Sequence, residues 1–334
     1  MTLADLLAVV LGLSLTTYAL LGGADFGAGI LDLLARESER DRAALATGIG
    51  PVWEANHVWL IFSITILFSA FPPAFSLLGT ALLAPFTIAL LVIVLRGAAL
   101  GLRSSATAGT PAHARLSHLC GIASAVAPLA FGMVAGGLAS ASTRVSDVHN
   151  GGLSIPWAGP FALAVGAMAL LLCLQLAASF MTIRLVRGGQ ARLVERFRRR
   201  GIHSAGALLV VSLGALGVAS WQAPALAHRL TTTALAIVIA GVVAMVGSIA
   251  AFYVRRYAIA RAASLSTGAA LVWGWLVSQS PHLVGSQLTI RAAAAPGPAL
   301  TAIAISIAAV LSAVIPAFYL LFAIFAQAVP EVSE

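Results

Sequence analysis

Nine apolar segments, each of about 20 residues or more, constrain the fold of this chain more than any other feature. Such a length is what an α-helix needs to cross the hydrocarbon core of a bilayer. Of the 334 residues, 60% are hydrophobic and 9% are charged, whereas about a quarter of the residues in soluble domains are charged. We therefore predict an all-α polytopic membrane protein, with one integral membrane domain over residues 1–334. The expected spans are about 4–34, 52–71, 76–102, 117–140, 158–184, 203–221, 230–254, 262–281 and 298–327.

The arginines predict how these spans are oriented. The chain has 19 arginines and no lysine; alternate loops hold 15 of them, and the intervening loops hold only Arg144, Arg229 and Arg291. Because cytoplasmic loops carry the excess of positive charge, we place the N-terminus outside and the C-terminus inside. The net charge of +8 is thus a topology signal, and we expect no nucleic-acid partner. The run from Arg184 to Arg200 is the longest expected link, a hinge between bundles.

The first span is expected to remain in the protein and to hold a buried acid. It carries Asp5 and no preceding basic region, which is unlike a cleaved signal peptide. Asp25 lies among four glycines in the sequence GGADFGAG at 22–29, and 11 residues separate it from Arg36. At 1.5 Å per residue, Asp25 is roughly 16 Å from the cytoplasmic surface. An ionisable residue at that depth is a candidate functional residue by default.

Three further polar residues enter the apolar segments near Asp25. Glu54 and His57 are three residues apart in the second span, so they share a helix face. Arg96 lies within the third span and is a candidate counter-ion. These carboxylates and the histidine are expected at increasing depth from the cytoplasmic side. Because each can take up and release a proton, the arrangement suits a proton pathway through Asp25, Glu54 and His57. The alternative is a neutralised structural cluster that fixes helix register.

We predict no catalytic residue and no metal or haem ligand in this chain. Haem ligation within the membrane needs two histidines at matched depth, or a histidine with a methionine. The remaining histidines fall in loops or at helix ends, so His57 has no evident partner. Cys120 and Cys173 are too far apart in sequence to indicate a zinc site or a redox pair, and we expect both to be packing residues.

With these residues in view, the first hundred positions resemble subunit II of the cytochrome bd family of quinol oxidases. Three ordered pieces carry the resemblance: GGADFGAG at 22–29, IGPVWEANHVWLIF at 49–62, and FSAFPPAF at 68–75, followed by a span that ends RGAALGLR at 96–103. Beyond residue 115 the likeness is a span pattern with small-residue helices, and Gln175 lies where the family tends to carry a polar residue in its fifth span.

The resemblance implies an architecture and a role. The architecture is two four-helix bundles plus a peripheral helix, in a bacterial-type cytoplasmic membrane. The role is subunit II of a terminal quinol oxidase, whose partner, subunit I, carries haem b, haem d and the quinol site and reduces dioxygen to water. Subunit II would support subunit I, help proton uptake and offer a face for a structural quinone. A small single-helix subunit and membrane lipids are further implied partners.

The chain also departs from the family pattern. Asp25 matches the second acid of the first-span motif, but Gly22 stands where the family often has another acid, and Gly101 stands where it often has one near the end of the third span. Glu54 replaces an aspartate found in many members, and His57 is unusual at its position. Two other functions remain open: a proton-coupled small-molecule transporter that uses the same buried acids, and a purely structural scaffold for subunit I.

Overall fold

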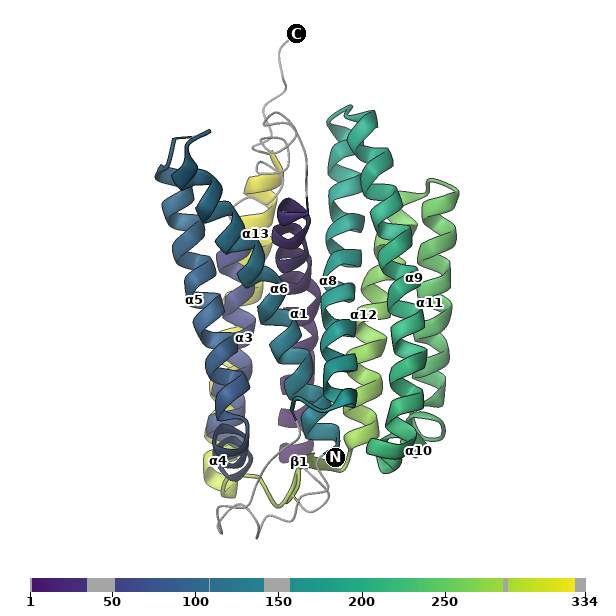
Figure 1. The fold of residues 1–334 in the computed structure, drawn as a ribbon. Helices are drawn as coiled ribbons and strands as arrows, with labels where there is room; N and C mark the ends of the chain where they lie inside the picture. The colour runs from purple at the N-terminus through teal and green to yellow at the C-terminus, as the bar shows by residue number, and fades with distance from the viewer. Residues whose placement is uncertain (1, 35–51, 108, 141–156, 285–287, 328–334) are drawn as a thin grey trace.

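The computed structural model describes residues 2–34, 52–107, 109–140, 157–284 and 288–327. Within these ranges the side chains of residues 52–55, 318–319 and 321–327 are not described. Long helices run alongside one another (Figure 1). The elements are α1 (Leu3–Leu33), α3 (Val52–Ala70), α4 (Pro72–Ala81), α5 (Leu83–Ser105), α6 (Pro111–Ser140), α8 (Pro160–Arg187), α9 (Ala191–Gln222), α10 (Pro224–Leu230), α11 (Leu235–Tyr253), α12 (Tyr257–Gln279), β1 (His282–Val284), β2 (Leu288–Thr289) and α13 (Gly297–Gln327).

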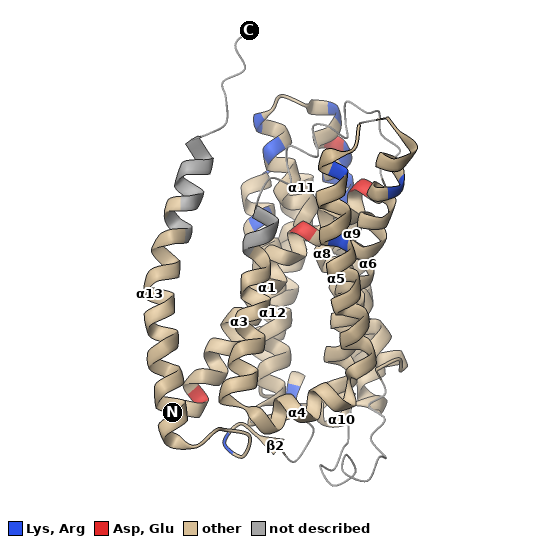
Figure 2. Ribbon diagram, turned by 90° about the vertical axis from the view of Figure 1, so that its left-hand side faces the viewer, with Lys and Arg blue, Asp and Glu red and all other residues tan. Residues whose placement is uncertain are grey.

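Eight of the long helices form two groups of four, and α13 stands apart. The first bundle contains α1, α3, α5 and α6, and the second contains α8, α9, α11 and α12; α8 packs on both α1 and α6 and so joins them. Within the described part of the chain, α13 makes its main contacts with α1 and α3, and Figure 2 shows it beside the other helices. This arrangement confirms the predicted all-α architecture of two bundles plus a peripheral helix.

Seven of the described helices are each long and apolar enough to cross a membrane: α1, α5, α6, α8, α9, α11 and the first 21 residues of α13. The pair α3 and α4 qualifies as an eighth, with a bend of 116° between its two parts. α12 has 23 residues and packs against α8, α11 and α1, but its serines, threonine and tryptophans make it less apolar. The count of nine spans therefore stays a prediction, with α12 as the ninth.

The expected third span, residues 76–102, is interrupted in the structure. α4 ends at Ala81 and α5 begins at Leu83, after Leu82 leaves helical geometry with φ −115° and ψ 23°. The bend before α4 lies at Phe71, whose φ of −133° and ψ of 56° are not helical. A residue that precedes proline is disfavoured in the helical region, and Pro72 follows Phe71 directly. The seventh expected span likewise begins later than expected, at Leu235, because the short helix α10 precedes it.

The link between α8 and α9 is a tight turn and not the expected long hinge. α8 continues to Arg187 and α9 begins at Ala191, so most of the arginine-rich run is helical. The turn needs a left-handed residue, and Gly189 supplies it with φ +67°, which glycine adopts without steric cost. Arginine is a good helix former, so positive charge in the sequence did not mean a loop.

Positive charge gathers at one end of the molecule. In Figure 2 most of the blue residues lie at the end opposite the N-terminus. The end of α5 carries Arg103, and the end of α8 carries Arg184 and Arg187. Arg229 lies in α10 at the other end. This distribution supports the predicted orientation, with the N-terminus outside and this arginine-rich end in the cytoplasm.

A buried polar network connects three helices of the second bundle. Nε2 of Gln175 on α8 donates to the hydroxyl of Ser248 on α11 at 3.2 Å and to that of Ser264 on α12 at 3.3 Å. The two hydroxyl oxygens lie 3.0 Å apart, and all three residues are fully buried. Hydrogen bonds between helices are a main means of association in membranes, where the lipid is as apolar as the side chains.

Replacing Gln175 by Leu should therefore weaken the packing of α8 against α11 and α12. We expect a loss of about 1 kcal/mol, the size of an interhelical hydrogen bond in a membrane protein, seen as a lower midpoint temperature for unfolding in detergent. The matched control is Ser220→Ala, because the exposed Ser220 hydroxyl bonds only to the carbonyl of Gly217 in its own helix. Equal midpoints for Gln175→Leu and the wild type would show that the network does not stabilise the bundle.

Candidate functional site

The candidate site is a buried ion pair between Asp25 on α1 and Arg96 on α5. Nη2 of Arg96 lies 2.8 Å from Oδ1 of Asp25, and the side chains are only 2% and 6% exposed. Glycines on α1 let neighbouring helices cover this carboxylate. A Cβ atom on Gly23 would lie 3.2 Å from Leu176 of α8, and one on Gly27 would overlap the backbone of Cys173. Close helix packing therefore excludes most of the solvent from Asp25.

Arg96 is held by contacts from two more directions. Its Nε donates to the hydroxyl of Ser124 on α6 at 2.8 Å, and that hydroxyl donates to the carbonyl of Cys120 at 2.7 Å. The guanidinium carbon lies 4.9 Å from the centre of the Phe26 ring, within the range of a cation–π interaction. The planar guanidinium thus joins α5 to both α1 and α6.

The charges of this pair are close but not fully hydrogen-bonded. Despite the 2.8 Å separation, neither carboxylate oxygen of Asp25 meets hydrogen-bond geometry with a described residue, and Nη1 of Arg96 also has no such partner. Buried polar atoms are nearly always hydrogen-bonded in proteins, and exceptions often mark functional sites. Among the described residues, the pair therefore keeps unused capacity to accept and donate hydrogen bonds.

His57 of α3 lies against the aromatic side chains that flank Asp25. Its ring centre is 6.2 Å from that of Tyr18 and 6.3 Å from that of Phe26. The Tyr18 hydroxyl is buried without a hydrogen-bond partner among the described residues. Asn56 donates to the carbonyl of Leu21 at 3.3 Å and so fixes this part of α3 on α1. The structure thus brings His57, Asp25 and Arg96 into one cluster.

Glu54 lies in the first turn of α3, but its side chain is outside the described residues. Its expected place in a proton pathway therefore rests on its position in the sequence. Since Glu54 precedes His57 by three residues on the same helix, the two share a helix face.

Sequence reasoning missed Tyr18, Ser124 and a further acid on α1, Asp32. Tyr18, Asp25 and Asp32 are spaced seven residues apart, which places them on one face of a helix. This spacing was visible in the sequence and could have identified both neighbours of Asp25. Ser124 carries no comparable signal, because α6 is rich in small residues at many positions and only packing selects the one that meets Arg96.

No described residues form a metal site. In the part of the chain that the structure describes, no three His, Cys, Asp or Glu side chains lie close enough to hold an ion. Cys120 and Cys173 are buried and free. Of the other described histidines, His113 and His118 lie in the first third of α6, His203 lies in α9, His228 in α10 and His282 in β1. The lack of a haem ligand in this chain stays a prediction.

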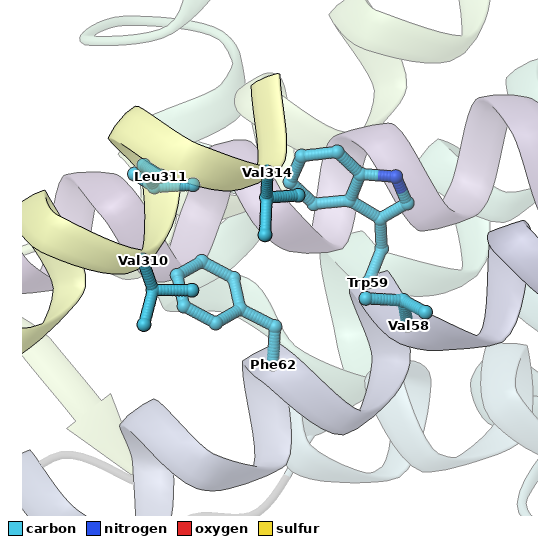
Figure 3. Close-up of a pocket in the computed structure, with 6 residues that line it drawn as sticks. All are labelled: Val58, Trp59, Phe62, Val310, Leu311 and Val314. Atoms are coloured by element: carbon cyan, nitrogen blue, oxygen red, sulfur yellow. The ribbon is translucent and has the colours of Figure 1, made fainter. Parts of the chain in front are cut away.

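A shallow apolar groove lies between α3 and α13. Figure 3 shows aromatic and aliphatic side chains from the two helices that face each other across it. Every lining side chain is apolar except for the indole nitrogen of Trp59, and the groove opens to the outside of the bundle. The lining residues are Val58, Trp59, Phe62, Val310, Leu311 and Val314.

Comparison with known proteins identifies the family. The pattern of the family described as "Cytochrome bd terminal oxidase subunit II" matches residues 3–325, nearly the whole chain. This chain belongs to that family. The resemblance seen in the sequence is therefore confirmed, and the chain is a subunit of a quinol oxidase complex, an oxidoreductase of the respiratory chain with multiple membrane-spanning helices.

Individual relatives agree with this assignment. The chain is 24% identical over 264 residues to "Cytochrome bd ubiquinol oxidase subunit 2" of Bacillus subtilis, covering 76% of this chain and 73% of the relative. It is 35% identical over 81 residues to the "Putative cytochrome bd menaquinol oxidase subunit II" of the same organism, covering 24% and 23%. The fold of this bd oxidase subunit II is similar to a chain of the bd oxidase from Geobacillus thermodenitrificans, with a TM-score of 0.76, 21% identity, and coverage of 97% and 99%.

Proposed function

We propose that this bd oxidase subunit II supports a haem-bearing subunit I and carries protons from the cytoplasm to it, past Glu54 and His57 to Asp25, with Arg96 as the counter-ion of Asp25. The observation that carries the proposal is the Asp25–Arg96 pair. It is buried, it lies beside His57, and it is incompletely hydrogen-bonded. Titratable groups arranged in this way suit proton transfer.

The haems belong to the partner in this proposal. The sequence predicts no haem ligand in this chain, because the histidines other than His57 fall in loops or at helix ends and none is an evident second haem ligand. Haem b and haem d are therefore assigned to subunit I, which also oxidises the quinol. No step of the chemistry at iron is assigned to residues of this chain.

Apolar surfaces of the helices are the contact sites that we assign to the quinone, to subunit I, to lipids and to a small subunit. The groove between α3 and α13 has the apolar lining that an isoprenoid quinone tail requires, and we assign the structural quinone to it. Large apolar side chains point outward from α5, α9, α11 and α13, including Leu90, Val210, Val243 and Ile305. These faces are the surfaces available to subunit I, membrane lipids and a small single-helix subunit.

Replacing Glu54 by Gln in the assembled complex should slow oxygen consumption several-fold while leaving assembly and haem content unchanged. Gln keeps the size and the hydrogen-bonding groups of Glu but cannot release a proton. The matched control is Glu195→Gln on α9, where the acid pairs with Arg198 and Arg199 far from Asp25. Unchanged turnover of the Glu54→Gln complex would exclude a relay role for Glu54 and favour the structural alternative. The family match already favours an oxidase subunit over the transporter.

A further inference from the structure

Two ion pairs, and not one, connect α1 to α5. Besides Asp25 and Arg96, Nη1 of Arg103 lies 2.9 Å from Oδ2 of Asp32. In both helices the second partner follows the first by seven residues, so the pairs are stacked about 10.5 Å apart along the helix axes. α5 packs mainly on α6, and its two arginines reach across to α1.

The outer pair lies at the arginine-rich, cytoplasmic end and remains in contact with water. The side chains of Arg103 and Asp32 are 17% and 16% exposed, against 2% and 6% for Arg96 and Asp25. Arg103 donates to Oδ2 of Asp32, and Oδ1 accepts no hydrogen bond from a described residue. Asp32 is therefore partly exposed to water, whereas Asp25 is sealed inside the bundle.

A hydroxyl group lies at the level between the two carboxylates. A Cβ atom on Gly29 would lie 2.8 Å from Cβ of Ser124, and Gly29 is four residues after Asp25 and three before Asp32. The Ser124 hydroxyl bonds to Arg96. The same hydroxyl donates to the carbonyl of Cys120. A polar group of α6 thus lies at a level between the two ion pairs.

We propose that Asp32 is a second carboxylate, besides Glu54, that collects protons from the cytoplasm for Asp25, and that Arg103 positions it. Cytoplasmic water or a buffer acid protonates Asp32, and inward transfer of that proton regenerates the carboxylate without movement of electrons. This inference rests on the proposed proton-uptake function and extends it.

The alternative is a purely structural pair that holds α5 against α1. The two roles differ in what a neutral isostere does. Asn at position 32 can still accept a hydrogen bond from Arg103 and fill the same space, but it cannot carry a proton. Gln at position 103 breaks the ion pair but leaves the carboxylate. If Asp32 collects protons, Asp32→Asn should lose more turnover than Arg103→Gln. If the pair is only structural, Arg103→Gln should lose at least as much assembled complex as Asp32→Asn.

The test is oxygen consumption by the purified complex at fixed pH, normalised to haem content, for Asp32→Asn, Asp32→Glu, Arg103→Gln and Asp25→Asn, with Glu195→Gln as the control. We expect the Asp32→Asn complex to consume oxygen several-fold more slowly than the wild type, and the Asp32→Glu complex to approach the wild-type rate. Added acetate should restore the rate of the Asp32→Asn complex but not that of the Asp25→Asn complex, whose altered side chain is buried. A small weak acid can replace a lost carboxylate only where water reaches it, and it would not repair a structural defect.

Two contrary outcomes are distinguishable. If Asp25→Asn is slowed while Asp32→Asn turns over at the wild-type rate per haem, with or without acetate, the role of Asp32 is wrong and the proposed proton uptake through Asp25 stands. If Asp25→Asn, Glu54→Gln and Asp32→Asn all turn over normally, proton uptake through this subunit is wrong, and both ion pairs are structural.

Discussion

Replacing Arg96 by Gln should destabilise the complex by about 3–5 kcal/mol, the usual cost of removing one partner from a buried ion pair. The guanidinium is the closest positive charge to Asp25 and also bonds to Ser124. Without it the Asp25 carboxylate would remain in a nearly dry site, uncompensated. The measurement is the midpoint temperature for unfolding of the detergent-solubilised complex, together with the amount of assembled complex in membranes.

A double variant separates loss of charge balance from loss of contacts. Combining Arg96→Gln with Asp25→Asn removes both charges and leaves two amides that can hydrogen-bond, so we expect most of the stability to return. Arg96→Lys keeps the positive charge but loses the cation–π contact with Phe26 and the bond to Ser124, so it should be intermediate. If Arg96→Gln is as stable as the wild type, the pair does not hold the first bundle together.

Replacing Gly27 by Ala should also cause a large loss of stability, because Gly27 lies where α1 of the first bundle packs against α8 of the second. The added methyl group would overlap the carbonyl group of Cys173 on α8 and lie 2.8 Å from Cβ of Ala177. The obstacle is backbone, which cannot rotate away, so α1 and α8 must separate. We expect a loss of more than about 3 kcal/mol, at or beyond the upper end for overpacking, and little assembled complex.

Gly101 provides the matched control for this substitution. It also lies inside a helix of the first bundle, but nothing is within 4 Å of the position that a Cβ atom would take. Gly101→Ala should therefore be neutral or stabilising by up to about 1 kcal/mol, since alanine is the better helix former. Equal unfolding midpoints for the Gly27→Ala and Gly101→Ala complexes would contradict the packing of α1 against α8 described above.

Two features could be predicted from the sequence: that the chain is a membrane protein, and that Asp25 pairs with Arg96. Both follow from the high free energy of an unpaired charge in lipid. Apolar segments of about 20 residues show a membrane protein directly, and an isolated Asp and Arg in two such segments have few partners other than each other. Counting residues to the nearest loop arginine also placed Asp25 and Arg96 toward the same end of their spans. The structure brings their side chains within 2.8 Å.

The sequence did not reveal features that depend on packing or on local backbone geometry. Asp32 lies near a helix end, where an acid is normally solvated, and only the approach of α5 gives it Arg103 as a partner. The break at Leu82 was hidden because the residues on both sides of it are apolar enough to continue a span. The helical start of α9 was hidden because arginines were read as a loop. Gly27 could be recognised as a position of close helix packing, but the sequence does not show that Cys173, which is remote along the chain, packs against it.

The most direct test of the central claim is a visible spectrum of the complex purified by a tag on this chain, followed by separation of its subunits. We expect absorbance from haem b and haem d in the intact complex, a second apolar chain on the gel, and all of the haem with that second chain after separation. Haem that stays with this chain would contradict the assignment of the haems to subunit I. A stable, colourless preparation of this chain alone would contradict its role as the haem-free partner in an oxidase.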